Sequence, residues 1–336
     1  MIKQNIKCIC IIIGIIIGAG FSSGKEIYIF FNRYNSNGLI GIIVAALILG
    51  IITYKTLYLI KKNNIKNYED FLNIITKKNN KIVIIIKTIV NIFLLISFFI
   101  MIAGFAACIE QELKINKIIG SIFIAFLCYI TFNKDIEGIA KASIVLVPII
   151  IVVIIGLGKN NLNFYNKIKI ESFFSYKWII SSVLYASYNT ITLITVLPSL
   201  NRYIKKQKQI GIISVCIAIM TAALATIIYA LLLNIKIDIN LIELPTIYAI
   251  SKYGIIYKNI FGVIILGAIY TTAISSGYGF LENISKNKKQ YNNYGFLICS
   301  LSIPISTVGF SNMVTFAFPI FGVLGLIQII LLIPKQ

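Results

Sequence analysis

Apolar runs of about twenty residues recur along the whole chain, and short polar segments that are mostly basic separate them. A helix of that length crosses the roughly 30 Å hydrocarbon core of a bilayer, so we expect about ten membrane-spanning helices. The expected spans cover residues 7–31, 38–60, 82–109, 116–132, 138–158, 176–200, 209–234, 256–284, 292–309 and 311–333. The segment Asn240–Tyr253 is too polar and too short to span, and we expect it to form a helix in an external loop.

The spans divide into two sets of similar length. Residues 7–158 hold the first five and residues 176–333 the last five, and the polar stretch Lys159–Lys177 joins them. Because five is an odd number, the second set enters the membrane in the opposite orientation, which is the layout of an inverted repeat. We therefore predict one transmembrane domain over residues 1–336, built from two inverted five-helix repeats.

Composition supports an all-α polytopic membrane protein. The chain has 336 residues, of which 58% are hydrophobic, and its mean hydropathy is +0.91. Those values exceed what a soluble globular protein shows. The alternating ten-residue segments of an outer-membrane barrel are absent from the sequence. We expect a multi-pass protein of a bacterial cytoplasmic membrane.

The formal net charge of +20 is explained by membrane orientation. With the N-terminus in the cytoplasm, the inner segments carry nearly twice as many Lys and Arg residues as the outer ones. This asymmetry follows the positive-inside rule and predicts that both termini are cytoplasmic. The basic residues lie mostly in short loops between apolar runs, so we expect the lipid bilayer as a partner and no nucleic acid.

The chemistry of a metal site or an enzyme has little support in the sequence. There is no histidine, and the six cysteines lie inside or at the edge of apolar runs, with no CxxC pair. We expect buried free thiols, no resident metal or cofactor, and no catalytic residues. Paired carboxylates deep in a span and a nucleophile motif are also absent, so an enzyme is not predicted.

The first span carries the segment GAGFSSG at Gly18–Gly24. Each glycine costs roughly 1 kcal/mol in a helix interior, so this cluster indicates that the helix unwinds. Unwound backbone at membrane depth is tolerated where it is buried in protein or lines a wet cavity, which predicts a binding site. The alternative is a small-residue packing face of the GxxxG kind.

Two further polar clusters lie within spans. Tyr185–Thr190, in the sixth span, predicts a second interrupted helix that faces the first. Thr271–Gly277, in the eighth span, is rich in hydroxyl groups. Those hydroxyls either bond to their own helix or supply oxygen ligands to a cation such as sodium.

Two adjacent charges follow the glycine cluster. Lys25 and Glu26 lie in the outer half of the first span and, as neighbours on a helix, do not face each other. A carboxylate inside the membrane is a functional candidate, so Glu26 is expected to be an external gate, a proton carrier or a contact for a substrate amine. The alternative is that both side chains extend to the outer interface.

At these residues the sequence resembles a known group of proteins. GAGFSSGKE (residues 18–26) resembles the GAGFASG[QR]E signature of the YkvI-like bacterial membrane proteins, within the amino acid–polyamine–organocation superfamily. YASYN (185–189) and YTTAISSGYG (270–279) resemble the sixth and eighth spans of that group. The resemblance implies a LeuT-type 5+5 fold with broken helices 1 and 6, and transporter ancestry.

The resemblance also implies roles for particular residues. The pattern G-x-x-x-G-x-G matches Gly14, Gly18 and Gly20, and the backbone amides near Ala19, Gly20 and Phe21 would bind a substrate carboxylate. A sodium ion would bind the carbonyls of Gly14, Ile17 and Ala268 and the hydroxyls of Thr271 and Thr272. In the rival interpretation Lys141, in the fifth span, occupies the cation site and exchanges protons. The alternative for Lys141 is that its side chain only extends to the membrane interface.

We therefore expect a secondary active transporter of a small organic solute, an amino acid or a related amine, that is coupled to sodium or protons and works by alternating access. The alternatives are a non-transporting ligand-binding subunit, as in germinant receptors, and a carrier coupled to protons rather than sodium. The sequence predicts no oligomeric state. The residues expected to face the solute are Ala19, Gly20, Phe21, Ser22, Tyr185, Ser187, Tyr188 and Asn189.

Overall fold

The computed structural model describes residues 2–65, 67–132, 148–156, 176–235 and 237–333. These residues form helices and connecting segments, and none of them lies in a β-strand. Residues 148–156 are helical as well. The α-helices are α1 (Ile2–Ile16), α2 (Ala19–Ser22), α3 (Lys25–Phe30), α4 (Asn35–Lys62), α5 (Tyr68–Ile75), α6 (Asn80–Leu113), α7 (Lys117–Phe132), α9 (Lys177–Val196), α10 (Gln207–Leu232), α11 (Pro245–Ser251), α12 (Ile255–Ile284), α13 (Lys288–Ile305) and α14 (Phe310–Leu332).

Short 3-10 helices connect several of these elements. They are η1 (Asn32–Tyr34), η3 (Leu197–Tyr203), η4 (Ile239–Leu241) and η5 (Ser306–Val308). Asparagine side chains begin three of the α-helices by accepting hydrogen bonds from backbone N–H groups of the first turn: Asn67 before α5, Asn79 before α6 and Asn287 before α13.

The helices form a membrane-embedded bundle. Among the described residues, six helical segments are long and apolar enough to cross a bilayer: Lys25–Lys62, Asn80–Leu113, Lys177–Tyr203, Gln207–Leu232, Ile255–Ile284 and Phe310–Leu332. Gln4–Ile16 and Lys117–Phe132 are shorter apolar helices. Large apolar side chains such as Ile85, Phe126 and Phe316 lie exposed on the outside of the bundle. An exposed apolar surface of this kind fits contact with lipid.

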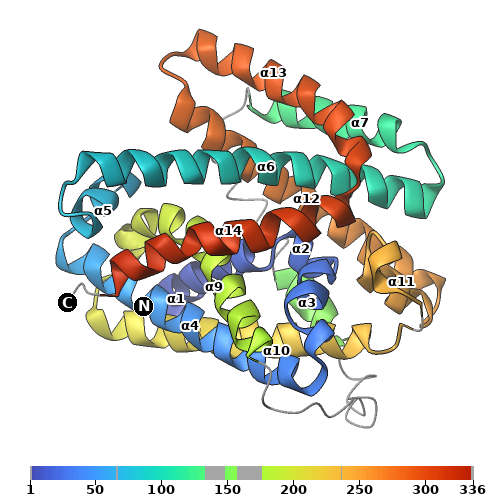
Figure 1. Cartoon of the computed structure of the whole chain (residues 1–336), viewed down its shortest axis with the longest axis horizontal. Helices are drawn as coiled ribbons and strands as arrows, with labels where there is room; N and C mark the ends of the chain where they lie inside the picture. The colour runs from blue at the N-terminus through green and yellow to red at the C-terminus, as the bar shows by residue number, and fades with distance from the viewer. Residues whose placement is uncertain (1, 66, 133–147, 157–175, 236, 334–336) are drawn as a thin grey trace.

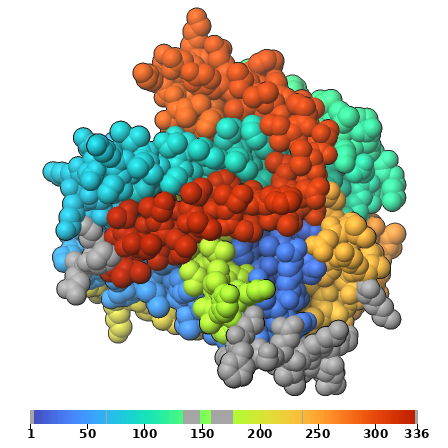
Figure 2. Space-filling view, viewed as in Figure 1, coloured from blue at the N-terminus to red at the C-terminus, as the bar shows by residue number. Residues whose placement is uncertain are grey.

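The bundle is built from packed helix pairs. Helix α14 packs on α9, α12 packs on α6, and α10 packs on α4. In Figure 1 the beginning of α1 and the end of α14 lie at one end of the bundle, and α11 lies at the other. Helices α7 and α13 contact each other and form an outer layer beside α6. Figure 2 shows α14 crossing this face, with α6 beside it.

The described helices match the expected spans to within a few residues at most boundaries. The predicted loop helix within Asn240–Tyr253 is confirmed as α11. The expected span 138–158 lies partly outside the described residues, and so does Lys141. The number of ten spans, the inverted repeat and the single domain stay predictions.

The predicted interruption of the first span is confirmed. Helix α1 ends at Ile16, Gly18 is extended (φ −72°, ψ −175°), and α2 lasts a single turn before Gly24 separates it from α3. Gly24 has φ 79°, a left-handed conformation that favours glycine. A Cβ at Gly24 would also lie 2.8 Å from Cγ2 of Thr246. The glycines therefore permit two changes of backbone direction within one span.

The predicted interruption of the sixth span is wrong. Helix α9 continues without a break through Tyr185–Thr190 and changes to the 3-10 helix η3 only at Leu197, next to Pro198. Three polar side chains of the cluster, those of Ser187, Asn189 and Thr190, bond to carbonyls one turn earlier in the same helix, as Asn189 Nδ2 does with Tyr185 O (3.0 Å). Because the cluster has no glycine and these three side chains are satisfied inside the helix, the helix has no reason to unwind there.

Candidate functional site

The break in the first span lies beside the hydroxyl cluster of α12. A Cβ added to Gly18 would lie 3.9 Å from Oγ1 of Thr272. Helix α2 packs on α12, so the structure brings together the first and eighth spans as the sequence predicts. The proximity follows from tertiary packing of segments about 250 residues apart.

The threonine hydroxyls of α12 bond to their own helix. Oγ1 of Thr271 and Oγ1 of Thr272 donate to the carbonyl of Ala268, at 3.0 and 2.8 Å. Each hydroxyl oxygen keeps lone pairs that are free to coordinate a cation. On the first span, Ile17 is buried at the end of α1 and Gly14 is half-buried one turn earlier. The candidate ligands at this place are carbonyl and hydroxyl oxygens, which carry no formal charge. Among the described residues, no group of three His, Cys, Asp or Glu side chains converges to hold a metal.

The short helix α2 is fully enclosed by protein. Ala19, Gly20, Phe21 and Ser22 are all buried. Ser23 Oγ donates to the carbonyl of Gly20 (2.8 Å). Within the described part of the chain, Oγ of Ser22 has no hydrogen-bond partner. A buried unsatisfied hydroxyl next to unwound backbone marks a place where a ligand or water can bind.

Glu26 connects the break to α9. Its side chain is 4% exposed, and its carboxyl group accepts a hydrogen bond from the hydroxyl of Tyr188. The same carboxyl group lies against the backbone of Gly20, where a Cβ would be 1.9 Å from Oε1. Glu26 therefore does not extend to the interface, and it links two of the residues expected to face the solute.

Aromatic rings pack around Tyr188, whose hydroxyl meets this carboxyl group. The ring of Tyr188 stacks on Phe30 on one side (centroids 5.6 Å apart, 20° between planes) and on Phe318 of α14 on the other (5.0 Å, 21°). Tyr185 meets Tyr188 edge-on at 5.5 Å. The hydroxyl of Tyr185 is buried and has no hydrogen-bond partner among the residues described. Sequence reasoning missed Phe30 and Phe318, because nothing in the local pattern separates them from other apolar positions.

Two expected site residues have their polar atoms occupied within α9. Ser187 Oγ donates to Val183 O at 2.7 Å, and the Asn189 amide bonds to Tyr185 O. The backbone carbonyl of Ser187 is covered by α14, since a Cβ on Gly325 would lie 2.2 Å from it. Ser187 and Asn189 both lie in the buried face of α9. The residues of this helix that the structure brings to Glu26 are Tyr185 and Tyr188.

Lys25 is buried and points away from Glu26. Its Nζ donates to the carbonyls of Ile239 (2.9 Å), Ile242 (3.2 Å) and Asn240 (3.4 Å). The side chain is 0% exposed, so the interpretation in which it extends to the interface is wrong. A buried ammonium group needs such acceptors, because losing its water without replacement is costly.

The segment Ile239–Thr246, here called the outer cover, is fixed onto the break. Thr246 N donates to Ser23 O (3.0 Å), and Thr246 Oγ1 donates to Ser22 O (2.7 Å). On the other side of the cover, Glu243 accepts from the backbone N–H of Ser311 at the start of α14 (2.6 Å). The cover thus joins the first span to α14.

The opposite end of the first span is fixed as well. Nε2 of Gln209, in the first turn of α10, donates to Oδ1 of Asn5 (2.6 Å), and both groups are buried. The ammonium group of Lys7 lies 4.4 Å from the ring centre of Tyr203. The interrupted helix is therefore tied to other elements above and below its break.

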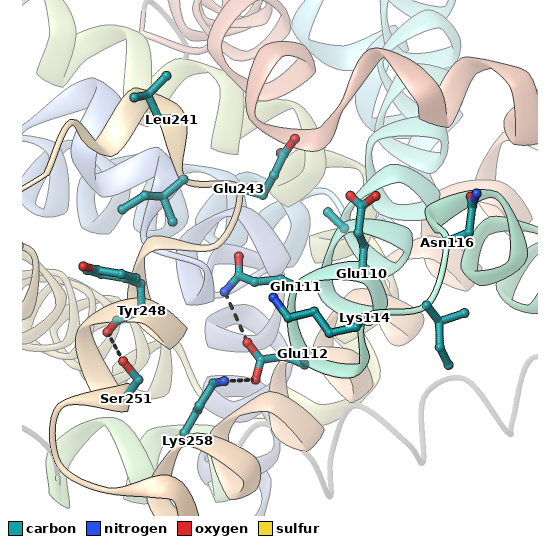
Figure 3. A pocket seen from close by; sticks show the side chains of 13 residues that line it. Glu110, Gln111, Glu112, Lys114, Asn116, Leu241, Glu243, Tyr248, Ser251 and Lys258 are labelled. Atoms are coloured by element: carbon teal, nitrogen blue, oxygen red, sulfur yellow. Dashed lines mark hydrogen bonds and ion pairs between the residues drawn. The ribbon is translucent and has the colours of Figure 1, made fainter.

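A pocket of about 550 Å³ opens beside the outer cover. Figure 3 shows it between the end of α6, the cover, α11 and the start of α12. Lys258 and Glu112 form an ion pair across it (2.9 Å), and Glu110, Lys114 and Glu243 also line it. The ion pair thus connects the end of α6 with the start of α12.

The fold is similar to that of a solved membrane transporter. Over 96% of this chain and 76% of the other, the structure is similar to a Na⁺-coupled sialic acid symporter in a substrate-bound outward-open state, with a TM-score of 0.63 and 13% identity. A manganese transporter from Eremococcus coleocola has a TM-score of 0.45 and 10% identity over 97% of this chain and 70% of that one.

By sequence the chain is similar to two proteins of Bacillus subtilis (strain 168) over nearly its whole length. It is 23% identical to the uncharacterized membrane protein YkvI over 338 residues, and this aligned region covers 96% of this chain and 94% of YkvI. It is 21% identical over 342 residues to the uncharacterized protein YyaD, covering 98% of this chain and 96% of YyaD. The sequence matches no family model.

Proposed function

We propose that this membrane protein is a secondary active transporter of a small organic solute, an amino acid or a related amine. The observation that carries the proposal is the buried interruption of the first span, which is tied to the outer cover at one end and to α10 at the other. A site with separate closures on its two sides can open to one side at a time. Ion binding then shifts the balance between the two states.

The coupling ion has two candidate sites. Sodium would bind the carbonyls of Gly14, Ile17 and Ala268 and the hydroxyls of Thr271 and Thr272, a proposal supported by the position of Gly18 beside Thr272. A proton would bind Glu26, a proposal supported by its burial and its hydrogen bond with Tyr188. Lys141 remains a third candidate from the sequence alone. We place the protein in a bacterial cytoplasmic membrane with both termini inside.

Flux into proteoliposomes tests the proposal. The purified full chain is reconstituted, and uptake of radiolabelled amino acids and amines is measured under a sodium gradient, under a pH gradient and without a gradient. Uptake that exceeds that of protein-free liposomes and rises with one gradient supports a coupled transporter. Binding of a solute without flux under any gradient would contradict transport and support the alternative function, a non-transporting ligand-binding subunit.

A control variant separates site effects from general damage. Gly262 lies in α12, and a Cβ there would meet nothing within 4 Å. Gly262→Ala should therefore leave uptake unchanged, as a check on reconstitution. A fall in uptake by Gly262→Ala that matches the fall in the site variants would show that the assay measures protein yield. The flux would then be normalised to the amount of inserted protein.

A further inference from the structure

Another pocket, of about 440 Å³, lies between the last turn of α4 and the 3-10 helix η3. This volume is within the range of small-molecule sites. Lys55 of α4 bonds to the carbonyl of Ile333 after α14, so the pocket is at the end of the bundle that is proposed to face the cytoplasm. The residues that line it are Lys61, Asn64, Pro198, Ser199, Asn201 and Arg202.

The pocket has two cationic side chains and no carboxylate among the described residues that line it. Lys61 is half-buried, and within the described part of the chain its ammonium group has no hydrogen bond and no ion pair. The guanidinium group of Arg202 lies 4.8 Å from the ring centre of Tyr203 and pairs with none of the described carboxylates. Two uncompensated cations in one concave site attract an anion.

The two walls of the pocket are fixed to each other. Nδ2 of Asn201, in η3, donates to Oδ1 of Asn64 (3.3 Å) and to the carbonyl of Ile65 (2.9 Å), both in the segment after α4. Asn64 uses its side-chain oxygen in this bond, so its Nδ2 is available to donate to a ligand. A site that is held in place before binding avoids the entropy cost of ordering its walls.

The position of the pocket favours a phosphate group among the possible anions. Lys61 lies in the last turn of α4, directly after an apolar run, which is the level of the lipid headgroups. Basic pockets at the cytoplasmic ends of membrane helices bind phosphate-containing headgroups. The planar guanidinium group of an arginine matches two phosphate oxygens at once, and a lysine adds a point charge.

We infer that the pocket between α4 and η3 is a binding site for a phosphate group. Arg202 donates to two phosphate oxygens, Lys61 offsets the negative charge, and Nδ2 of Asn64 donates a further hydrogen bond. The phosphate belongs either to the headgroup of an anionic phospholipid or to a soluble phosphate compound. The pocket shares no lining residue with the interruption of the first span, so this inference does not rest on the transport function proposed above.

Thermal shifts of the purified full chain in detergent measure binding, because a ligand that binds the folded state raises Tm. Phosphatidylglycerol is compared with phosphatidylcholine at equal mole fraction in the micelles. Glycerol 3-phosphate and inorganic phosphate are each compared with sodium chloride at equal ionic strength, so that screening stays the same. We expect at least one phosphate compound to raise Tm above its control, with a rise that saturates with concentration.

Variants assign this binding to the pocket. The double variant Lys61→Gln/Arg202→Gln removes both cations and should raise the concentration for half-maximal effect about tenfold or more. Lys288→Gln/Lys289→Gln removes the same charge from exposed positions of α13 and should leave binding unchanged. Lys61→Arg keeps the charge and should keep binding. If the double variant does not fold, Lys61→Gln and Arg202→Gln are compared singly with the same control.

Each outcome decides the inference. A rise with phosphatidylglycerol alone, weakened in the pocket variant, supports it and identifies a lipid headgroup as the source. A rise with glycerol 3-phosphate or inorganic phosphate, weakened in the same variant, supports it and identifies a soluble ligand. No rise with any compound overturns it, and so does a rise that is equal in the pocket variant and the α13 variant. None of these results depends on flux, so a failure here leaves the proposed transporter standing.

Discussion

The ammonium group of Lys25 lies 2.9 Å from the carbonyl oxygen of Ile239, which is 214 residues away in the sequence. This hydrogen bond and two longer ones attach the start of α3 to the outer cover. Lys25 and Glu26 are neighbours in the chain, yet one side chain secures the cover and the other enters the interruption. The two charges therefore serve different parts of the molecule.

Replacing Lys25 by Met should loosen the outer cover. A hydrogen bond to a charged group contributes about 1.5–3 kcal/mol, so losing the ammonium group should speed local opening by about tenfold or more. Hydrogen–deuterium exchange at the Thr246 amide, which donates to Ser23 O, measures that opening. Lys289→Met, at an exposed position of α13, is the control. Unchanged exchange at Thr246 in Lys25→Met would show that the cover is held by other contacts.

Replacing Gly20 by Val should abolish solute binding while membrane insertion stays intact. The new Cβ would collide with the Glu26 carboxyl group at 1.9 Å and displace it from the break. Thermal shift with the preferred compound gives binding, and size-exclusion chromatography in detergent gives folding. Gly211→Ala, where a Cβ has open space, should behave like the unaltered chain. Ligand binding that survives in Gly20→Val contradicts a site at the interruption.

Replacing Thr272 by Val should weaken any dependence of binding on sodium. The variant keeps the shape of the side chain and removes the hydroxyl oxygen beside Gly18. We expect the sodium concentration for half-maximal effect to rise about tenfold, the usual order for one lost polar ligand. Thr88→Val is a matched control, because the Thr88 hydroxyl also bonds one turn back in its helix (2.9 Å to Ile84 O) but is exposed on α6.

Equal sodium responses in the Thr272 and Thr88 variants would remove this position from the cation site. A response to pH in place of sodium would direct attention to Glu26. The measurement is a titration of sodium chloride against choline chloride at constant ionic strength, so that screening of surface charges stays the same throughout.

Replacing Gly325 by Ala should destabilise the pair α9–α14. The added Cβ would lie 2.2 Å from the carbonyl oxygen of Ser187, a backbone atom that cannot rotate away. Overpacking of this kind costs about 1–3 kcal/mol, so Tm should fall by several degrees. Gly262→Ala, which has open space, should leave Tm unchanged. An unchanged Tm in Gly325→Ala would mean that the two helices separate without cost.

The placement of the spans and the break in the first helix could be predicted because both depend on local properties. Long apolar runs need helical backbone in lipid, and the glycines at 18, 20 and 24 lower the cost of leaving the helix. The same reasoning failed for Tyr185–Thr190. A polar cluster resembles a break in sequence, but Ser187, Asn189 and Thr190 bond to carbonyls of the preceding turn of α9.

The sequence by itself thus determined that this is a helical membrane protein with an interrupted first span and a charged pair after it. Only the tertiary structure decided that Lys25 bonds to the outer cover and that Glu26 lies on Gly20 and meets Tyr188. Those contacts join segments that are far apart along the chain. Their partners are chosen by helix packing, which no local pattern of residues records.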